Sequence, residues 1–349
     1  MKKMMLILTM LLLASAPVFA RPPKDQYNYE PKAPRVERDA TSSWKEITPG
    51  LHGAVATIDQ RFTKWDVPTL NESKRTLKLT GWRGERVAGQ VVVWSGEAMN
   101  QLRTIATPAV GIKPTVNFVR FVHGADKAKY DGLYGDILDT ASEIAVQGKT
   151  ARAVWYAVDI PADAKPGVHK ATLTIRAAGM KPVVVNVEID VIGMTLPTPD
   201  KWAYHLDLWQ HPWAIARGHN VEMFSKEFYA VAKPLFQRLA GAGQKCLTVS
   251  VNDRPWNQQT YDAYGTMIEW IKQADGTWKY DYSKFDEYAA FGEECGITSQ
   301  INCYSMVPWG NVFHYIDGAT GDRKSFRANP GTKAYTEFWT PFLKDFTKH

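Results

Sequence analysis

Two different hydrophobic patterns divide the chain. Between residues 44 and 196, short apolar stretches alternate with polar residues at a period of two, as where Leu173 and Ile175 follow Thr172 and Thr174. Gly, Pro and Asp interrupt these stretches at short intervals. Short alternating strands with turn residues between them predict an antiparallel β-sandwich. The clearest strands are expected at residues 76–80, 89–94, 116–122, 153–160, 171–176 and 183–192.

Beyond residue 200 the period changes to three and four. Phe228, Val231, Leu235 and Leu239 predict the apolar face of a helix over residues 225–242, with Ser225 as its N-cap. Further helices are expected at 283–295 and 332–348, and strands at 202–209, 246–252 and 300–306. Strands that alternate with helices predict a parallel α/β domain.

The length of this second region limits what it can form. Residues 200–349 hold three βα units, whereas a closed (β/α)8 barrel takes about 250 residues. We therefore expect an incomplete (β/α)8-type barrel here, following a β-sandwich at 44–196. We also expect the natural polypeptide to continue past His349.

The N-terminus carries a targeting signal. Lys2 and Lys3 precede an apolar run, and small residues lead to Ala20, which predicts a signal peptide over residues 1–20. The apolar run is shorter than the roughly 20 residues of a membrane span. The mature protein is therefore expected in the periplasm or outside the cell, without membrane insertion. Residues 21–43, rich in Pro and charge, are expected to be a flexible segment.

Composition narrows the function classes. The chain is 45% hydrophobic and 22% charged, which is typical of a globular protein. Its 42 Lys and Arg against 36 Asp and Glu form no basic run, so nucleic acid is not an expected partner. The 13 Trp fit either core packing or stacking on sugar rings.

Three cysteines remain in the mature chain: Cys246, Cys295 and Cys303. Their spacing matches no zinc motif. One disulfide with one free thiol is possible, but three reduced and buried thiols are favoured.

Polar residues along the predicted barrel strands point to a ligand site. Alternation places Thr248, Ser250 and Asn252 on one row, opposite apolar residues that should bury against helices. A polar inner row indicates a site at the carboxyl ends of the strands, although such residues can also satisfy one another. Aromatic and polar residues continue past the strand ends at Trp209, Gln210, His211, Asn252, Asp253, Trp256, Tyr304 and Trp309, and such groups suit a hydroxylated ring.

The sequence evidence for catalytic or metal-binding residues is weaker than that for a ligand site. His205, Asp207 and His211 lack a third ligand in a recognised pattern, so a hydrogen-bonding role is favoured over metal binding. The adjacent acids Asp286–Glu287 and Glu293–Glu294 fall in a predicted helix and are expected on its solvated face. No phosphate loop or nucleophile motif is present. No acid/base pair, cofactor or metal is therefore assigned.

Several long strings resemble glycoside hydrolase family 123, whose members are secreted β-N-acetylgalactosaminidases. The resemblance covers residues from about 80 to 349. It rests on residues 84–90, 205–213, 253–261, 275–282 and 300–309, which read GERVAGQ, HLDLWQHPW, DRPWNQQTY, DGTWKYDY and QINCYSMVPW. It implies an N-terminal sandwich followed by a catalytic (β/α)8 barrel.

The resemblance also implies a mechanism and a substrate. In this family the substrate's own 2-acetamido group acts as the nucleophile, and an adjacent Asp–Glu pair orients it and serves as acid and base. That pair is expected beyond His349, so the 349-residue chain alone is expected to be inactive. The implied partner is a glycan with terminal N-acetylgalactosamine. The sugar contacts that the resemblance implies are Asp207, Trp209, Gln210, His211, Asn252, Asp253, Trp256, Asn302, Tyr304 and Trp309. The alternatives are a non-catalytic protein that binds such a sugar, and a purely structural protein.

Overall fold

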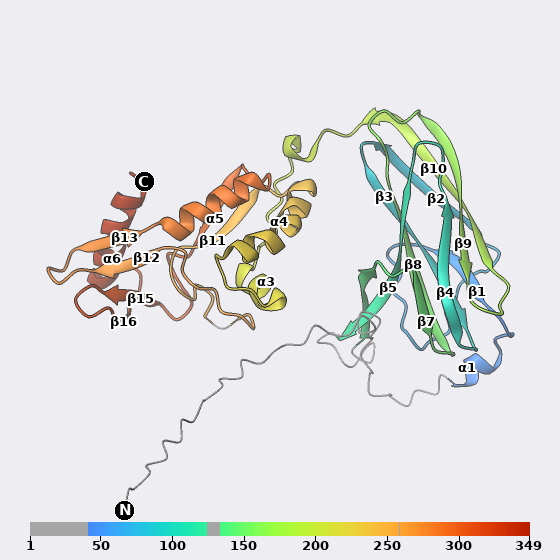
Figure 1. Ribbon diagram of the computed structural model, residues 1–349, viewed down its shortest axis with the longest axis horizontal. Helices are drawn as coiled ribbons and strands as arrows, with labels where there is room; N and C mark the ends of the chain where they lie inside the picture. The colour runs from blue at the N-terminus through green and yellow to red at the C-terminus, as the bar shows by residue number, and fades with distance from the viewer. Residues whose placement is uncertain (1–40, 124–132, 258) are drawn as a thin grey trace, which may run out of the picture. The chain divides into compact units, whose positions relative to one another are not determined.

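The computed structural model describes residues 41–123, 133–257 and 259–349, and the predicted signal peptide lies outside them. The described chain divides into two compact units, the first ending at Leu196 and the second beginning at Pro197 (Figure 1). Within the described residues, none of the helices combines the length and the apolar composition that a bilayer crossing requires. Each unit is described separately below.

The first unit consists of two five-stranded sheets. One sheet has the order β1 (His52–Ala56), β3 (Arg86–Ser95), β8 (Thr150–Asp159), β5 (Pro114–His123), β6 (Leu133–Asp139). The other has the order β2 (Thr76–Arg83), β10 (Val183–Thr195), β9 (Gly167–Arg176), β4 (Met99–Thr107), β7 (Glu143–Val146).

The two sheets share one hydrophobic core, which is the arrangement of a β-sandwich. Leu173 and Ile175 of β9 are fully buried, and Val154 and Tyr156 of β8 reach the same core from the other sheet. Alternate side chains of a strand point to opposite faces, so the period-two pattern in the sequence supplies this core. The six strands expected from the sequence all form.

Several details differ from the expectation. The sequence analysis did not identify β1, β4, β6 and β7. Strand β10 pairs with β2 in parallel, with Val187 opposite Leu77, so the sandwich is not wholly antiparallel. About a hundred residues separate these strands, and a connection that long lets either direction form. Residues 41–43, expected to be flexible, begin the short helix α1 (Thr41–Lys45).

The second unit contains the predicted helices and a short parallel sheet. The helices are η2 (Pro199–Lys201), α3 (Pro212–His219), α4 (Lys226–Gly241), α5 (Ser283–Glu294) and α6 (Lys333–Phe346). Strands β11 (Cys246–Ser250) and β14 (Gln300–Tyr304) pair in parallel. The predicted helices thus form within a few residues of their expected ends, and α3 was not anticipated.

Helix α4 shows both the strength and the limit of the periodicity argument. Its N-cap is Ser225, whose hydroxyl accepts a hydrogen bond of 3.1 Å from the amide of Phe228. The buried face is Phe228, Ala232 and Phe236, however, and Leu235 is 41% exposed. The buried stripe is therefore rotated from the predicted one and includes the small residue Ala232.

The described residues form no closed barrel. Over residues 202–209 the only strand-like pairing is a single parallel bridge between Leu206 and Gln244, so the expected first strand is not formed. A separate four-stranded sheet is formed by two hairpins that follow β11 and β14 in the chain. Its order is β13 (Trp278–Asp281), β12 (Glu269–Lys272), β15 (Val312–Asp317), β16 (Arg323–Arg327).

Helix α6 packs on this second sheet (Figure 1). Phe338 and Phe342 of α6 stack on the indole of Trp270 in β12, with ring centroids 4.1 and 4.2 Å apart. The aromatic rings of the two hairpins therefore supply the surface that buries the apolar face of this helix. The sequence predicted the helix but neither this four-stranded sheet nor the contact between the two.

The apolar row of β14 was expected to bury against helices, but it is exposed. Ile301 is 43% exposed and Cys303 is exposed as well. Cys246 and Cys295 are buried, and all three cysteines are free thiols. The expectation of three buried thiols is thus wrong for Cys303.

Candidate functional site

A hydrogen bond between Asp207 and Asn302 joins two of the predicted sugar-contacting residues. Nδ2 of Asn302 in β14 donates to Oδ2 of Asp207 over 2.7 Å, across 95 residues of sequence. The other carboxylate oxygen of Asp207, Oδ1, is buried and has no hydrogen-bond partner among the described residues. Asp207 is half-buried and can accept a hydrogen bond from a ligand hydroxyl after a small movement.

Three aromatic rings gather around the C-terminal end of β14. The ring of Trp209 lies 5.2 Å from that of Trp256 and 5.1 Å from that of Tyr304, and Trp256 lies 4.9 Å from Tyr304. Trp256 is 9% exposed, whereas Trp209 is 55% exposed. We call these three residues the aromatic cluster. Buried Trp256 and half-buried Tyr304 pack against Trp209 while leaving an indole surface open to a flat, apolar ligand face.

The electrostatics of Tyr304 connect the aromatic cluster to Asp207. Burial raises the pKa of Tyr304, and the negative charge of Asp207 raises it further. Hydrogen bonds from Trp209 and Asn302 act in the opposite direction and lower this pKa. Tyr304 therefore keeps its proton at neutral pH and can donate or accept a hydrogen bond.

Asn252 adds a second buried polar group at the end of β11. It is 1% exposed, and its Nδ2 donates to the carbonyl oxygen of Ser305 over 2.6 Å. Its Oδ1 has no hydrogen-bond partner within the part of the chain that the structure describes. An unpaired buried oxygen is costly, so a donor supplied by a ligand or by water would stabilise this site.

Gln210 and His211, also predicted sugar contacts, make hydrogen bonds within the fold. Gln210 is 3% exposed; its Oε1 accepts from the amide of Thr248 over 2.7 Å and its Nε2 donates to the carbonyls of Leu208 and Cys246. Its amide therefore ties residues 208–210 to β11. We leave Gln210 out of the site below.

His211 is the N-cap of α3. Its Nδ1 accepts from the amide of Ala214 over 3.4 Å, and its Nε2 lies 2.9 Å from the carbonyl oxygen of Asp262. Its ring stacks on Tyr264 at 3.8 Å. Burial lowers the pKa of His211, opposed by the contacts with Asp262. Both ring nitrogens are used by the neutral form, so His211 is also left out of the site below.

Asp253 is held by cations from two parts of the chain. Its Oδ2 lies 2.5 Å from Arg323 of β16 and 3.6 Å from both Arg254 and His314. Burial lowers the pKa of His314, and Asp253 opposes that shift. Asp253 is 8% exposed, so its carboxylate chiefly anchors the four-stranded sheet beside β11.

The remaining predicted residues are also placed. Trp309 is 55% exposed, and its backbone amide donates to the carbonyl of Pro255 over 2.9 Å, which ties its loop to that of Trp256. Asp286 and Glu287 are exposed on α5, as expected, and Asp286 pairs with His349 at 2.7 Å. The described residues contain no group of three or more His, Cys, Asp or Glu that could hold a metal ion.

The structure also reveals residues that the sequence analysis missed. Tyr264 is buried, stacks on His211 and lies 4.6 Å from Trp256. His314 and Arg323 come from the two strands of a hairpin. The turn residues Gly318 and Gly321 between two alternating stretches were a usable hairpin signal. Nothing in the sequence pointed to the contact between Arg323 and Asp253.

Comparisons with known proteins fit this arrangement. The model of the glycoside hydrolase 123 N-terminal domain matches residues 55–177, and that of the glycoside hydrolase 123 catalytic domain matches residues 209–349. The chain belongs to glycoside hydrolase family 123. The candidate residues all lie at or just before the part matched by the catalytic-domain model of family 123.

A solved structure supports the fold of this family 123 chain. It is a family 123 glycoside hydrolase from Clostridium perfringens, described in a study of glycolipid glycan hydrolysis. It matches with a TM-score of 0.78 and 23% identity, over 86% of this chain and 56% of that one. The chain thus spans little more than half the length of that protein.

Other comparisons add nothing further. The secreted serine protease VesC from Vibrio cholerae matches at 11% identity over 44% of this chain and 25% of its own. A Bacteroides ovatus xyloglucanase matches at 12% identity over 67% of this chain and 44% of its own. Their TM-scores of 0.22 and 0.21 are too low to indicate a shared fold. No curated protein matches the sequence.

Proposed function

We propose that the second unit supplies the sugar-binding wall of a secreted glycosidase that removes terminal β-linked N-acetylgalactosamine. The observation that carries this proposal is the aromatic cluster beside the Asp207–Asn302 hydrogen bond. A pyranose has one apolar face and a rim of hydroxyl groups. The open indole of Trp209 suits the face, and Asp207, Asn302 and Asn252 suit the hydroxyls.

The proposed reaction is substrate-assisted and retains the anomeric configuration. The acetamido oxygen of the sugar forms a bond to the anomeric carbon while the bond to the leaving oxygen breaks, and that oxygen takes a proton from a Glu. Water then attacks the anomeric carbon, the bond from that carbon to the acetamido oxygen breaks, and the water gives a proton back to the same Glu. An adjacent Asp orients the acetamido group.

We assign neither catalytic role to a described residue. Asp207 is hydrogen-bonded to Asn302, Asp253 is held by Arg323, and Asp286 and Glu287 lie exposed on α5. We therefore propose that the 349-residue polypeptide binds the sugar without cleaving its glycosides.

The arrangement of β11 and β14 supports a place in a larger (β/α)8 barrel. The two strands are parallel, with Thr248 opposite Asn302, and α5 lies between them in sequence. Parallel strands joined through a helix are the repeating unit of that fold. The bridge between Leu206 and Gln244 is also parallel, which fits a neighbouring strand.

Calorimetric titration of the 349-residue polypeptide with N-acetylgalactosamine tests the binding proposal. We expect weak binding, weakened at least about tenfold by Trp209→Ala or Asp207→Ala. The control is Trp82→Ala, which removes a half-buried indole from β2 in the other unit. Absence of binding, or equal binding by all variants, would reject the proposed site.

A second assay separates the enzyme from the non-catalytic alternative. Release of the aryl group from an aryl β-N-acetylgalactosaminide is measured for the 349-residue polypeptide and for one extended by the downstream coding sequence. The glycosidase proposal expects release only by the extended polypeptide. Binding without release by either would favour a carbohydrate-binding protein, and release by the shorter one would place the catalytic carboxylates among the residues described above.

A further inference from the structure

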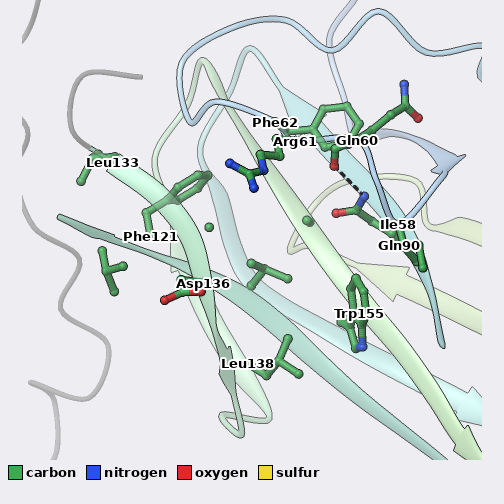
Figure 2. Close-up of a pocket in the computed structure, with 14 residues that line it drawn as sticks. Ile58, Gln60, Arg61, Phe62, Gln90, Phe121, Leu133, Asp136, Leu138 and Trp155 are labelled. Atoms are coloured by element: carbon green, nitrogen blue, oxygen red, sulfur yellow. Dashed lines mark hydrogen bonds between the residues drawn. The ribbon is translucent and has the colours of Figure 1, made fainter. Parts of the chain in front are cut away.

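A pocket of about 610 Å³ lies on the sandwich, on the sheet that contains β8 (Figure 2). Val154 and Tyr156 of β8 point into the core between the two sheets, so Trp155 between them points to the opposite, outer face. Further along this outer face, Trp44 and Phe62 pack over Trp94 and close it. The pocket is the part of the face beside that covered region.

The lining combines an aromatic surface with polar groups. Trp155 is half-buried, and Leu138 and Ile58 add exposed apolar surface. The guanidinium of Arg61 and the carboxylate of Asp136 lie around the same opening, and both residues are exposed (Figure 2). Within the described residues, neither Arg61 nor Asp136 has an ion-pair partner at 4.0 Å or less.

One wall of the pocket is fixed by a buried amide. Gln90 lies opposite Trp155 in the ladder between β3 and β8 and is 6% exposed. Its Nε2 donates to the carbonyl oxygens of Thr57 and Gln60, over 2.8 and 3.1 Å. These bonds hold residues 57–60 above the sheet, so Arg61, which follows directly, is presented at the opening.

We propose that this pocket binds a pyranose unit of a neutral oligosaccharide, at a site separate from the aromatic cluster of the second unit. Its volume falls within the range of about 300–1,000 Å³ that is usual for small-molecule sites. The indole face of Trp155 suits the apolar face of a sugar ring. Arg61 donates hydrogen bonds and Asp136 accepts them, so together they suit the hydroxyl groups of a sugar.

The charges distinguish this ligand class from two others. A wholly apolar ligand, such as an acyl chain, would desolvate Arg61 and Asp136 without giving either a partner, which is costly. A strongly charged ligand would meet one cation and one anion, whose effects largely cancel. A neutral ligand rich in hydroxyl groups satisfies both side chains and the aromatic surface together.

Calorimetric titration tests this proposal. The 349-residue polypeptide carrying Trp209→Ala is titrated with a neutral tetrasaccharide that ends in β-linked N-acetylgalactosamine. This background weakens the site proposed for the second unit, and every comparison is made within it, so failure of that proposal does not affect the result. We expect heat of binding in the background variant. Adding Trp155→Ala should weaken binding at least about tenfold, and Trp155→Phe should restore part of it.

Variants of the exposed residues Arg61 and Asp136 are easier to interpret than those of half-buried Trp155, because replacing an exposed side chain does not disturb the packing of the core. Arg61→Ala and Asp136→Asn should each weaken binding severalfold, whereas the control Trp82→Ala should leave it unchanged. Thermal melting of every variant checks that the sandwich is folded. No binding by the background variant, or equal binding after loss of Trp155 and Arg61, would overturn the proposal.

Discussion

Gly243 lies directly against the indole of Trp202. A Cβ added to Gly243 would come within 2.6 Å of Cε3 of Trp202, and the backbone of Gly243 has a φ of +90°, which L side chains rarely adopt. The indole in turn donates to the carbonyl oxygen of Pro197 over 2.6 Å. This close approach fixes the start of the second unit against the turn between α4 and β11.

Gly243→Ala is therefore expected to destabilise the second unit by about 1–3 kcal/mol, since it adds both a clash and backbone strain. Urea unfolding followed by tryptophan fluorescence measures the loss. Gly241→Ala is the matched control, because no atom lies within 4 Å of its added Cβ and its φ is not positive. Equal effects of the two substitutions would contradict the role given to Trp202.

Asn302→Ala should weaken the binding of N-acetylgalactosamine by about tenfold, because Asp207 loses the hydrogen bond that orients it. Calorimetric titration measures the affinity. The control is Ile301→Ala on the opposite, exposed face of β14, which should leave affinity unchanged. If both variants bind as the unaltered chain does, Asp207 needs no support from Asn302.

The stability of the second unit should fall as the pH is lowered below about 6.5. Burial holds the pKa values of His211 and His314 below their ordinary value of 6.5. The folded state therefore favours the neutral rings, and the unfolded chain binds more protons in this window. The stabilisation is complete above the unfolded pKa and is lost as the pH falls through the folded pKa.

Urea unfolding at a series of pH values between about 7.5 and 5 measures this dependence. His211→Asn keeps a side chain that can cap α3 but cannot titrate, so it should reduce the slope. His314 should account for part of the slope that remains. A slope that is unchanged in the His211→Asn variant would show that this ring does not contribute.

Alkylation should distinguish the cysteines. Cys303 is exposed on β14, whereas Cys246 and Cys295 are buried and burial raises their thiol pKa values. Partial desolvation also raises the pKa of Cys303, to about 11, so its reaction with iodoacetamide should be slow at neutral pH and faster in alkali. Mass spectrometry should find one label per native chain and none in Cys303→Ser. Labelling of Cys246 before Cys303 would contradict the burial of Cys246.

The sequence by itself determined the elements that depend on local pattern. Alternation at Leu173 and Ile175 predicted a sandwich strand, and the spacing around Phe228 with its cap at Ser225 predicted α4. It also placed Asp207, Trp209, Trp256, Asn302 and Tyr304 among the candidate residues, because polar and aromatic side chains follow the strand ends. The strand and helix predictions are confirmed because periodicity and capping act within one element, whereas the role of the candidate residues stays a prediction.

Only the tertiary structure decided which elements and residues meet. It placed α6 on the sheet that contains Trp270, left Ile301 and Cys303 exposed, and paired β2 with β10 in parallel. It also showed that Gln210 and His211 make hydrogen bonds to backbone groups, whereas Trp209 presents an exposed indole and Asp207 has an oxygen that is unpaired among the described residues. A sequence pattern records that a side chain is apolar or polar, but its partner comes from distant parts of the chain and is chosen by packing and hydrogen bonding in three dimensions.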